Sequence, residues 1–247
     1  MRRGLDPSTV RRNFKRQYGQ TLHEFARLAR LGRALDLMRQ GEGIDAAALA
    51  TGFESVSGFR DAFDRLFGVP PGQAARQDYI AVQWTPSPLG PLVLGATTRG
   101  VCLVEFSDRD RLAQQLESVR GVFKMPIVPA RSPLLEMVEQ ELERYFAGTL
   151  TRFTTALDYP GTPFQEKVWR ALLDIPYGAT CSYEALATAV GSPRGQRAVG
   201  LANGRNRLAI VIPCHRVVNK GGQLGGYGGG LRRKEYLLAL EKQRAGL

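Results

Sequence analysis

The sequence predicts a multi-domain protein of mixed α and α+β class, and three observations support this. The chain has 247 residues, more than a single domain usually holds. Apolar residues recur at helical spacing in residues 1–78 and 161–247, whereas β-like runs with turns dominate the start of residues 79–160. The turn Tyr159-Pro160-Gly161 marks the second change of pattern. We therefore predict three domains with these boundaries.

The positive charge of the chain is concentrated at its two ends. The formal net charge is +11. Residues 1–78 carry 13 Lys/Arg and 9 Asp/Glu, residues 79–160 carry 8 and 9, and residues 161–247 carry 13 and 5. A basic excess favours binding to a polyanion such as nucleic acid, because binding releases counterions. A solvated surface that is merely basic is the alternative on charge alone.

Several protein classes are disfavoured by composition. No apolar run approaches the roughly 20 residues of a membrane span, and Met1-Arg2-Arg3 is not followed by the apolar core of a signal peptide. The three cysteines, Cys102, Cys181 and Cys214, are too few and too widely spaced for a disulfide framework or a zinc quartet. We expect a cytoplasmic protein with no membrane partner, no metal and no cofactor.

Helical signals fill the first domain. Asp6-Pro7 is typical of an N-cap followed by proline in the first turn. Thr21 and Glu24 have the spacing of a capping box at the start of a longer helix. Small residues around Gly52 would let two short helices cross at a tight turn. The predicted helices cover residues 7–18, 21–38, 45–51 and 55–67.

The pattern Ala48…Gly52-Phe53…Phe59 is continued by Phe63 and Phe67, which we predict to be core residues. On this pattern, residues 5–76 resemble the DNA-binding domain of AraC-type transcription regulators. That domain carries two helix-turn-helix units joined by one long helix.

The resemblance is complete for the second unit, residues 44–76, whereas the first unit keeps only its recognition-like helix. It implies that promoter DNA binds through residues 44–76. The side chains that would face the major groove include Ser57 and Arg60.

The middle domain shows strand patterns followed by helical ones. We predict strands over residues 82–84, 92–96 and 101–106, and helices over residues 109–119 and 133–146. Cys102 alternates into the last strand and should be buried and inert. We interpret the four glutamates of the second helix as a solvated face, and the whole module as a scaffold without catalytic groups. These glutamates are Glu136, Glu139, Glu141 and Glu143.

The third domain opens with a second capping box, Thr162 to Gln165, with proline at the first helical position. Ser182 should cap a helix over residues 183–190, and Ser192-Pro193 should start another that runs to about residue 202. Arg194 and Arg197 would share one face of that helix. A solvated basic face is the alternative for this pair.

The most informative stretch is residues 211–218, in which Cys214 and His215 follow a proline. A buried strand with a core thiol is one interpretation, because free cysteines usually behave as small hydrophobes. Two features disfavour it: the dipeptide His215-Arg216 interrupts the apolar run, and Pro213 cannot donate to a sheet ladder. A thiol beside an imidazole is the pairing used in nucleophilic catalysis. Neighbours on an extended strand point to opposite faces, so a contact between them requires a turn of the backbone.

A glycine-rich run follows the cysteine. Residues 221–230 hold seven glycines and one large side chain, Tyr227. The run lacks the strand-to-helix placement and the lysine of a phosphate-binding loop. We interpret it as a mobile loop that closes near the thiol, before a final helix that carries Glu241.

The Pro-Cys-His-Arg-Val core at 213–217, its apolar flank and the glycine loop carry a second resemblance. Residues 79–247 resemble the O6-alkylguanine-DNA alkyltransferases, the methylated-DNA–protein-cysteine methyltransferases. With the AraC-type start, nearly the whole chain is similar to the bifunctional Ada-type proteins. The resemblance implies a small three-stranded ribonuclease-H-like α+β domain and a winged-helix-like helical C-terminal domain. It also implies a monomer that acts on double-stranded DNA with alkylated bases.

The resemblance also implies roles for single residues. Cys214 would be the methyl acceptor. His215, acting through a water held by Glu241, would deprotonate it. Tyr183 would donate to the departing guanine, and Asn206 would be the hinge between recognition helix and active site.

Further residues would contact the DNA. Arg197 would fill the gap left by a flipped base, and Arg194 would contact a phosphate. Ser182 and Tyr227 complete the expected DNA-binding set. The sequence departs from the family at Gly195-Gln196, where the family has small residues such as alanine, and it shows no cysteine-rich zinc module for phosphotriester repair.

The leading hypothesis is therefore direct DNA repair, with irreversible transfer of an alkyl group from O6 of guanine, or O4 of thymine, to Cys214. Transcription regulation would be an accessory function. The alternative is an AraC-type transcription regulator whose C-terminal half is only a damage sensor. A thiol hydrolase is a weaker alternative, because no third member of a catalytic triad is identifiable nearby.

Overall fold

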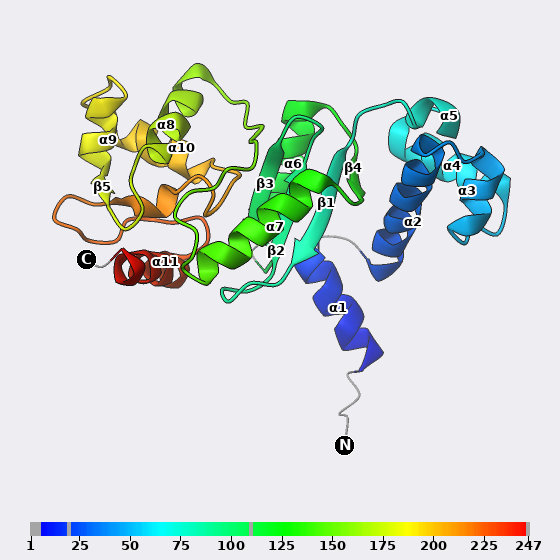
Figure 1. Cartoon of the computed structure of the whole chain (residues 1–247), viewed down its shortest axis with the longest axis horizontal. Coiled ribbons are helices and arrows are strands. Elements are labelled where there is room, and N and C mark those ends of the chain that lie inside the picture. Colours follow the sequence, from blue (N-terminus) through cyan, green and yellow to red (C-terminus); the bar gives the residue numbers. More distant parts are fainter. Residues whose placement is uncertain (1–5, 19–20, 109–110, 246–247) are drawn as a thin grey trace.

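The computed structural model describes residues 6–18, 21–108 and 111–245. Figure 1 shows an elongated arrangement, with a helical group at each end and a β-sheet between them. Within the described residues, no helix is long and apolar enough to cross a membrane. The predicted fold class, helical at both ends and α+β in the middle, is confirmed.

The N-terminal group is entirely helical. The capping box of Thr21 and Glu24 forms as predicted, with hydrogen bonds in both directions. Phe59 and Phe63 are fully buried and their rings lie 4.7 Å apart, so the prediction that they form the core is confirmed. The helices are α1 (Pro7–Tyr18), α2 (Leu22–Arg39), α3 (Ile44–Ala50), α4 (Val56–Phe67) and α5 (Pro71–Ala74).

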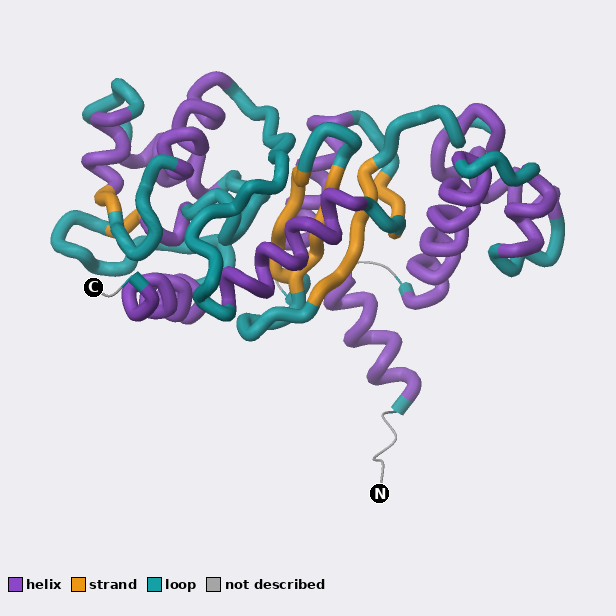
Figure 2. Tube along the Cα trace, viewed as in Figure 1, coloured by secondary structure: helices purple, strands orange, loops and turns teal. Residues whose placement is uncertain are grey.

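The middle group is a sheet with a helix on each face (Figure 2). Its elements are β1 (Ile80–Thr85), β2 (Leu92–Ala96), β3 (Val101–Phe106), α6 (Arg111–Phe123), β4 (Ile127–Pro129) and α7 (Pro133–Phe146). The strand order is β3-β2-β1-β4, with β4 parallel to β1 and the other pairs antiparallel. The sheet thus has four strands instead of the three expected. A three-residue strand that ends in proline is too short to show an alternating pattern.

Two other expectations for this domain can be compared with the structure. The helix expected over residues 109–119 runs from Arg111 to Phe123, and residues 109–110 lie outside the described part. Glu141 is not on a solvated face, because the loop after α7 folds back and donates to its carboxylate from Thr154 and Thr155. Cys102 is buried, as predicted, and burial raises the pKa of its thiol to about 12.

The C-terminal group surrounds the Cys214 segment. Its elements are α8 (Pro163–Leu173), β5 (Cys181–Ser182), α9 (Tyr183–Ala189), α10 (Gln196–Gly204), the 3₁₀ turn η1 (Cys214–Arg216), β6 (Val217–Val218) and α11 (Leu231–Arg244). Thr162 and Ser182 cap α8 and α9 as predicted. The helix expected from Ser192-Pro193 begins later, at Gln196. The amide of Gly195 donates to the carbonyl of Ser192 and closes a separate turn before the helix.

The helix α2 packs directly on the edge of the sheet. The ring of Phe25 lies edge-on to that of Trp84, with 4.8 Å between centroids. Arg39 donates to two carbonyl groups of the segment that leads into β1 and lies over the ring of Tyr79. At Gly32 the approach is closest, because a Cβ atom there would lie 2.1 Å from the carbonyl oxygen of Pro129. A glycine in mid-helix is thus required by the contact with β4.

We predict that Gly32→Ala destabilises the protein, although alanine favours helices. The added methyl group must displace backbone atoms of β4, and overpacking of this kind costs about 1–3 kcal/mol. Gly121→Ala in α6 is the matched control, because its added Cβ would meet no atom within 4 Å apart from its neighbours in the chain and the backbone of its own helix; there we expect a gain of about 0.5–1 kcal/mol. Thermal unfolding followed by circular dichroism measures both changes. A Gly32→Ala protein as stable as Gly121→Ala would contradict this account of the contact.

Candidate active site

Cys214 lies in a turn at the end of a buried, irregular segment. The segment from Asn206 to Cys214 follows α10, and Ile210 within it has a positive φ of 71°, which is rare for a β-branched residue. Cys214 begins the 3₁₀ turn η1, and its amide donates to the carbonyl of Ile212 at 2.8 Å. The backbone therefore turns at Pro213. A contact between the thiol of Cys214 and the adjacent His215 would require such a turn.

The side chain of Asn206 holds this segment together. Its Nδ2 group donates to Sγ of Cys214 at 3.2 Å and to the carbonyl of Ile212 at 2.9 Å. Its Oδ1 accepts from the amide of Leu208 at 2.9 Å. Asn206 is buried, so no solvent competes for these bonds. One amide thus fixes both the strained loop and the sulfur.

The carboxylate of Glu241 forms the centre of a buried hydrogen-bond network. Its oxygens accept from Nε and Nη2 of Arg216 at 2.8 and 3.0 Å, from the hydroxyl of Tyr145 at 2.7 Å, and from the amide of Gly178 at 3.2 Å. Nε2 of His215 lies 2.8 Å from Oε1. Burial alone would raise the pKa of Glu241, but hydrogen bonds from His215 and Arg216 and the positive charge of Arg216 lower it to about 2. The carboxylate is therefore an anion at neutral pH.

Burial determines the protonation of His215, and the Glu241 anion determines its tautomer. Burial lowers the pKa of the imidazole below its usual value of 6.5, so the ring is neutral at neutral pH. Its Nε2–H must donate to Glu241, which leaves the lone pair on Nδ1. Nδ1 has no hydrogen-bond partner among the described protein groups. α11 brings the carboxylate of Glu241 into direct contact with Nε2 of the ring, and the expected deprotonation of Cys214 through a water stays a prediction.

The thiol of Cys214 is only 8% exposed. Burial raises its pKa above the usual 9.0, and the hydrogen bond from Asn206 opposes that rise. The resting pair at neutral pH is therefore a protonated thiol and a neutral imidazole. Such a pair can react as a nucleophile only if the thiol proton moves to a base during the reaction.

A pocket of about 310 Å³ opens onto the thiol. Its lining residues are Tyr183, Gly200, Asn203, Gly204, Cys214, Gly226, Tyr227 and Gly228. The hydroxyl of Tyr183 donates to the carbonyl of Gly226 at 3.4 Å. A Cβ atom at Gly225 would lie 2.7 Å from the ring of Tyr183. The glycine loop therefore forms one wall of the pocket, and glycine is needed where its backbone meets the tyrosine.

Sequence reasoning missed Asn203 in this pocket. The residue is 8% exposed, and its side chain lies near the Tyr183 hydroxyl. Neither amide atom makes a hydrogen bond of good geometry within the described residues. The helix predicted to end at about residue 202 continues to Gly204, so Asn203 lies on α10. Its spacing of three from Gly200, another lining residue, is the signal that could have identified it.

The expected DNA-contacting residues lie in different places. Arg197 is exposed in the first turn of α10, but Arg194 lies in the turn before that helix, so the two do not share a helical face. The hydroxyl of Ser182 accepts from the amide of Ala185 as the cap of α9. Ser57 and Arg60 are exposed on α4, at the opposite end of the molecule from α10 (Figure 1).

Family models match three consecutive parts of the chain. Residues 2–77 match a helix-turn-helix domain. Residues 80–159 match the ribonuclease-like domain of 6-O-methylguanine DNA methyltransferase, and residues 163–243 match its DNA binding domain.

Individual relatives agree with these matches. The chain is 48% identical to a methylated-DNA–protein-cysteine methyltransferase of Mycobacterium leprae, over 64% of this chain and 90% of the relative. It is 34% identical to the regulatory protein ada of Salmonella typhimurium, over 97% of this chain and 68% of the relative.

Solved structures show the same likeness. The O6-methylguanine methyltransferase of Mycobacterium tuberculosis superposes with a TM-score of 0.58 and 40% identity, over 67% of this chain and 94% of that chain. The Mycobacterium tuberculosis OGT in complex with DNA gives a TM-score of 0.57 and 41% identity, over 66% and 94%. The chain therefore belongs to the methylated-DNA–protein-cysteine methyltransferase family and, like the regulatory protein ada, joins a helix-turn-helix domain to it.

Proposed function

We propose that the protein repairs DNA directly, by moving a methyl or other small alkyl group from O6 of guanine irreversibly to Sγ of Cys214. O4-alkylthymine would be a second substrate. The observation that carries the proposal is the buried thiol at a pocket, next to a neutral His215 that is held by an anionic Glu241. The mycobacterial relatives share the name methylated-DNA–protein-cysteine methyltransferase, which supports the same reaction.

The proposed step is a single displacement. Sγ of Cys214 bonds to the alkyl carbon as the bond from that carbon to O6 breaks, and the electron pair stays on the guanine. The thiol proton passes to Nδ1 of His215, directly or through water, and the Glu241 carboxylate stabilises the imidazolium. Burial raises the pKa of Tyr183, so its hydroxyl is protonated and can donate to the departing guanine. Solvent reprotonates the tyrosine when the imidazolium loses its proton, and the thioether that remains on the protein is not a nucleophile.

The substrate must leave the duplex to reach this pocket. An alkylated base within the stack is inaccessible, so we propose that it flips out. The exposed Arg197 at the start of α10 would fill the space from the minor groove, and Arg194 and Ser182 would contact the backbone beside it. Tyr227 would face the flipped base from the pocket wall, and Asn206 would serve as the hinge between α10 and the thiol.

A second function concerns the N-terminal helices. The exposed side chains of α4 and the match to a helix-turn-helix domain support promoter binding through residues 44–76, with Ser57 and Arg60 in the major groove. In the rival hypothesis this is the main function and the C-terminal half only senses damage. A promoter footprint that persists in Cys214→Ala, together with no alkyl transfer by the wild type, would favour the rival. The monomeric state and the cytoplasmic location remain predictions.

We predict that Cys214→Ala abolishes alkyl transfer, because no other thiol lines the pocket among the described residues. Cys181→Ser is the matched control and should retain transfer, since that partly exposed thiol is not a lining residue. The protein is incubated with a duplex that contains O6-methylguanine, and the cysteine peptides are weighed by mass spectrometry. A methyl group on Cys102 or Cys181, or none on the wild-type protein, would refute the assignment.

The pH dependence of alkyl transfer should follow the lowered pKa of His215. His215 accepts the thiol proton only when neutral, so the single-turnover rate should fall as the pH drops through the His215 pKa. Because burial lowers that pKa, the midpoint should lie below 6.5. Rapid-quench measurements from about pH 5 to about pH 9 test this. Stability also decreases as the pH drops below 6.5, since the unfolded state binds this proton first. Circular dichroism at each pH therefore separates unfolding from loss of activity, and a midpoint at or above 6.5 would contradict the proposed base.

The two DNA-binding surfaces should be separable. We predict that Arg197→Ala slows repair of duplex substrate but has less effect on single-stranded substrate, because an unstacked base leaves no gap to fill. Arg60→Ala, at the far end of the molecule, should leave repair unchanged and weaken only promoter binding. Single-turnover rates on both substrates and a promoter footprint give the comparison. Equal losses of repair in the two variants would show that the surfaces are not independent.

A further inference from the structure

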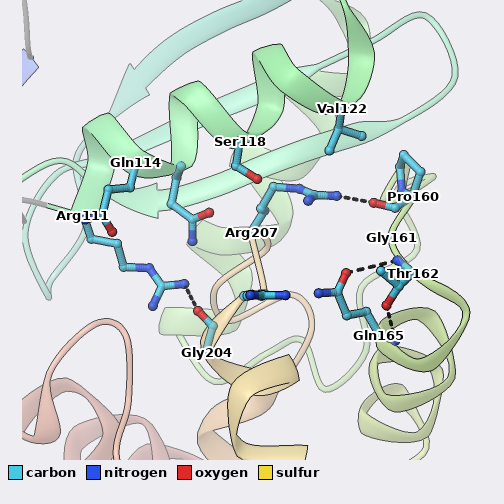
Figure 3. Close-up of a pocket in the computed structure, with 12 residues that line it drawn as sticks. Arg111, Gln114, Ser118, Val122, Pro160, Gly161, Thr162, Gln165, Gly204 and Arg207 are labelled. Atoms are coloured by element: carbon cyan, nitrogen blue, oxygen red, sulfur yellow. Dashed lines mark hydrogen bonds between the residues drawn. The ribbon is translucent and has the colours of Figure 1, made fainter. Parts of the chain in front are cut away.

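Side chains of the sheet domain hold two backbone carbonyl groups of the active-site domain. Nη2 of Arg111, on α6, donates to the carbonyl of Gly204 and also to that of Asn206, the latter at 3.2 Å. Nε2 of Gln115, one turn further along, donates to the same Asn206 carbonyl at 3.1 Å. Figure 3 shows Arg111 reaching from α6 to Gly204, along the wall of a cleft of about 660 Å³ that shares Gly204 with the thiol pocket.

Both donors are oriented by one buried carboxylate. Oε2 of Glu105, on β3, accepts from Nε of Arg111 and from Nε2 of Gln115, each at 3.1 Å. Its Oε1 accepts from the amide of Phe106 at 3.0 Å. Glu105 is 2% exposed, so this ion pair is largely removed from water. We refer to Glu105, Arg111 and Gln115 as the α6 clamp.

The backbone beyond the hinge is attached to the same strand. The amide of Val104 in β3 donates to the carbonyl of Arg207 at 2.8 Å, and the amide of Ala209 donates back to the carbonyl of Val104 at 2.8 Å. The chain after Asn206 is thus bonded to the sheet while the clamp holds the Asn206 carbonyl itself. The backbone of Asn206 is fixed on both sides, so its side chain has a defined direction toward Sγ of Cys214.

The clamp also reaches the glycine loop. A Cβ atom at Gly228 would lie 2.5 Å from Nη1 of Arg111. The guanidinium therefore touches the end of α10, the hinge and one wall of the thiol pocket at the same time. A buried ion pair contributes little net stability compared with apolar residues of the same size. Its presence at the junction of these three segments is better explained by the orientation that it imposes.

We propose that the α6 clamp positions Asn206, and through it the thiol of Cys214, so that Arg111 and Gln115 are positioning residues for alkyl transfer. The proposal rests on the proposed transfer to Cys214. With the hinge carbonyl released, the amide of Asn206 can rotate away from the sulfur. The thiolate then loses a hydrogen bond, so the pKa of Cys214 rises further and the reaction slows.

The sharpest test uses Gln115→Met, which removes one bond to the hinge without leaving a buried charge unpaired. Arg120→Gln is the matched control, because Arg120 lies on the same helix and pairs with Glu117 at the surface. With the full chain and saturating O6-methylguanine duplex, the single-turnover rate of Gln115→Met should fall about 5- to 10-fold, the equivalent of one hydrogen bond. Its dissociation constant for DNA should change less than about 2-fold, since the DNA-facing side chains are untouched.

A second readout does not depend on DNA. The rate at which iodoacetamide modifies Cys214, followed on its peptide by mass spectrometry, reports the thiolate fraction as a function of pH. We expect this profile to move to higher pH in Gln115→Met and in Arg111→Lys, which keeps the charge beside Glu105 but loses the planar fork. Arg120→Gln should retain the wild-type profile.

The outcomes separate the two proposals. If Gln115→Met and Arg111→Lys fold and match Arg120→Gln in iodoacetamide profile, the clamp is only a structural contact and the inference is wrong. If the wild-type protein transfers no alkyl group, the proposed function fails, and the iodoacetamide profiles still decide whether the clamp controls the thiol. A loss of DNA affinity with an unchanged profile would also overturn the inference.

Discussion

The buried carboxylate of Glu241 is the interaction on which the active-site domain depends. It receives hydrogen bonds from His215 and Arg216 on the 3₁₀ turn, from the amide of Gly178, and from Tyr145 of the sheet domain. Its removal would leave the Arg216 guanidinium buried without its charge partner, which costs about 3–5 kcal/mol in comparable cases. The same anion that orders the turn also keeps His215 in the tautomer that can accept a proton. The Glu241 carboxylate thus serves both the fold of the turn and the proposed proton transfer.

The sheet domain contributes more to the site than a scaffold would. Tyr145 on α7 donates to Glu241, and Arg111 and Gln115 on α6 donate to the backbone carbonyl of Asn206. Residues outside the C-terminal domain therefore support the surroundings of the thiol from two sides, through Glu241 and through Asn206. A domain boundary drawn along the chain does not coincide with the boundary of the catalytic unit, because polar side chains cross the interface wherever a buried carbonyl or carboxylate needs a partner.

Local signals in the sequence were reliable where local physics decides. Capping boxes at Thr21 and Thr162 formed as predicted, since they involve atoms three residues apart. Contacts between residues far apart in the chain produced no pattern that could be recognised in the sequence. The strand β4 is too short for a pattern, and Glu141 was misread because Thr154 and Thr155 return to it only in the folded chain. Asn203 was missed because α10 continues about two residues past its predicted end, and Asn203 lies in that extension.

The fold class, the helix-turn-helix pattern and the Cys214-His215 dipeptide after Pro213 could be recognised from the sequence, because they depend on residue type and short spacing. The groups that surround this dipeptide became visible only in the folded chain. The direct contact of Glu241 with His215, the bond from Asn206 to the sulfur and the clamp from α6 join residues 8 to 95 positions apart. No local pattern encodes such contacts, because they arise only when buried polar groups must find partners in a packed interior.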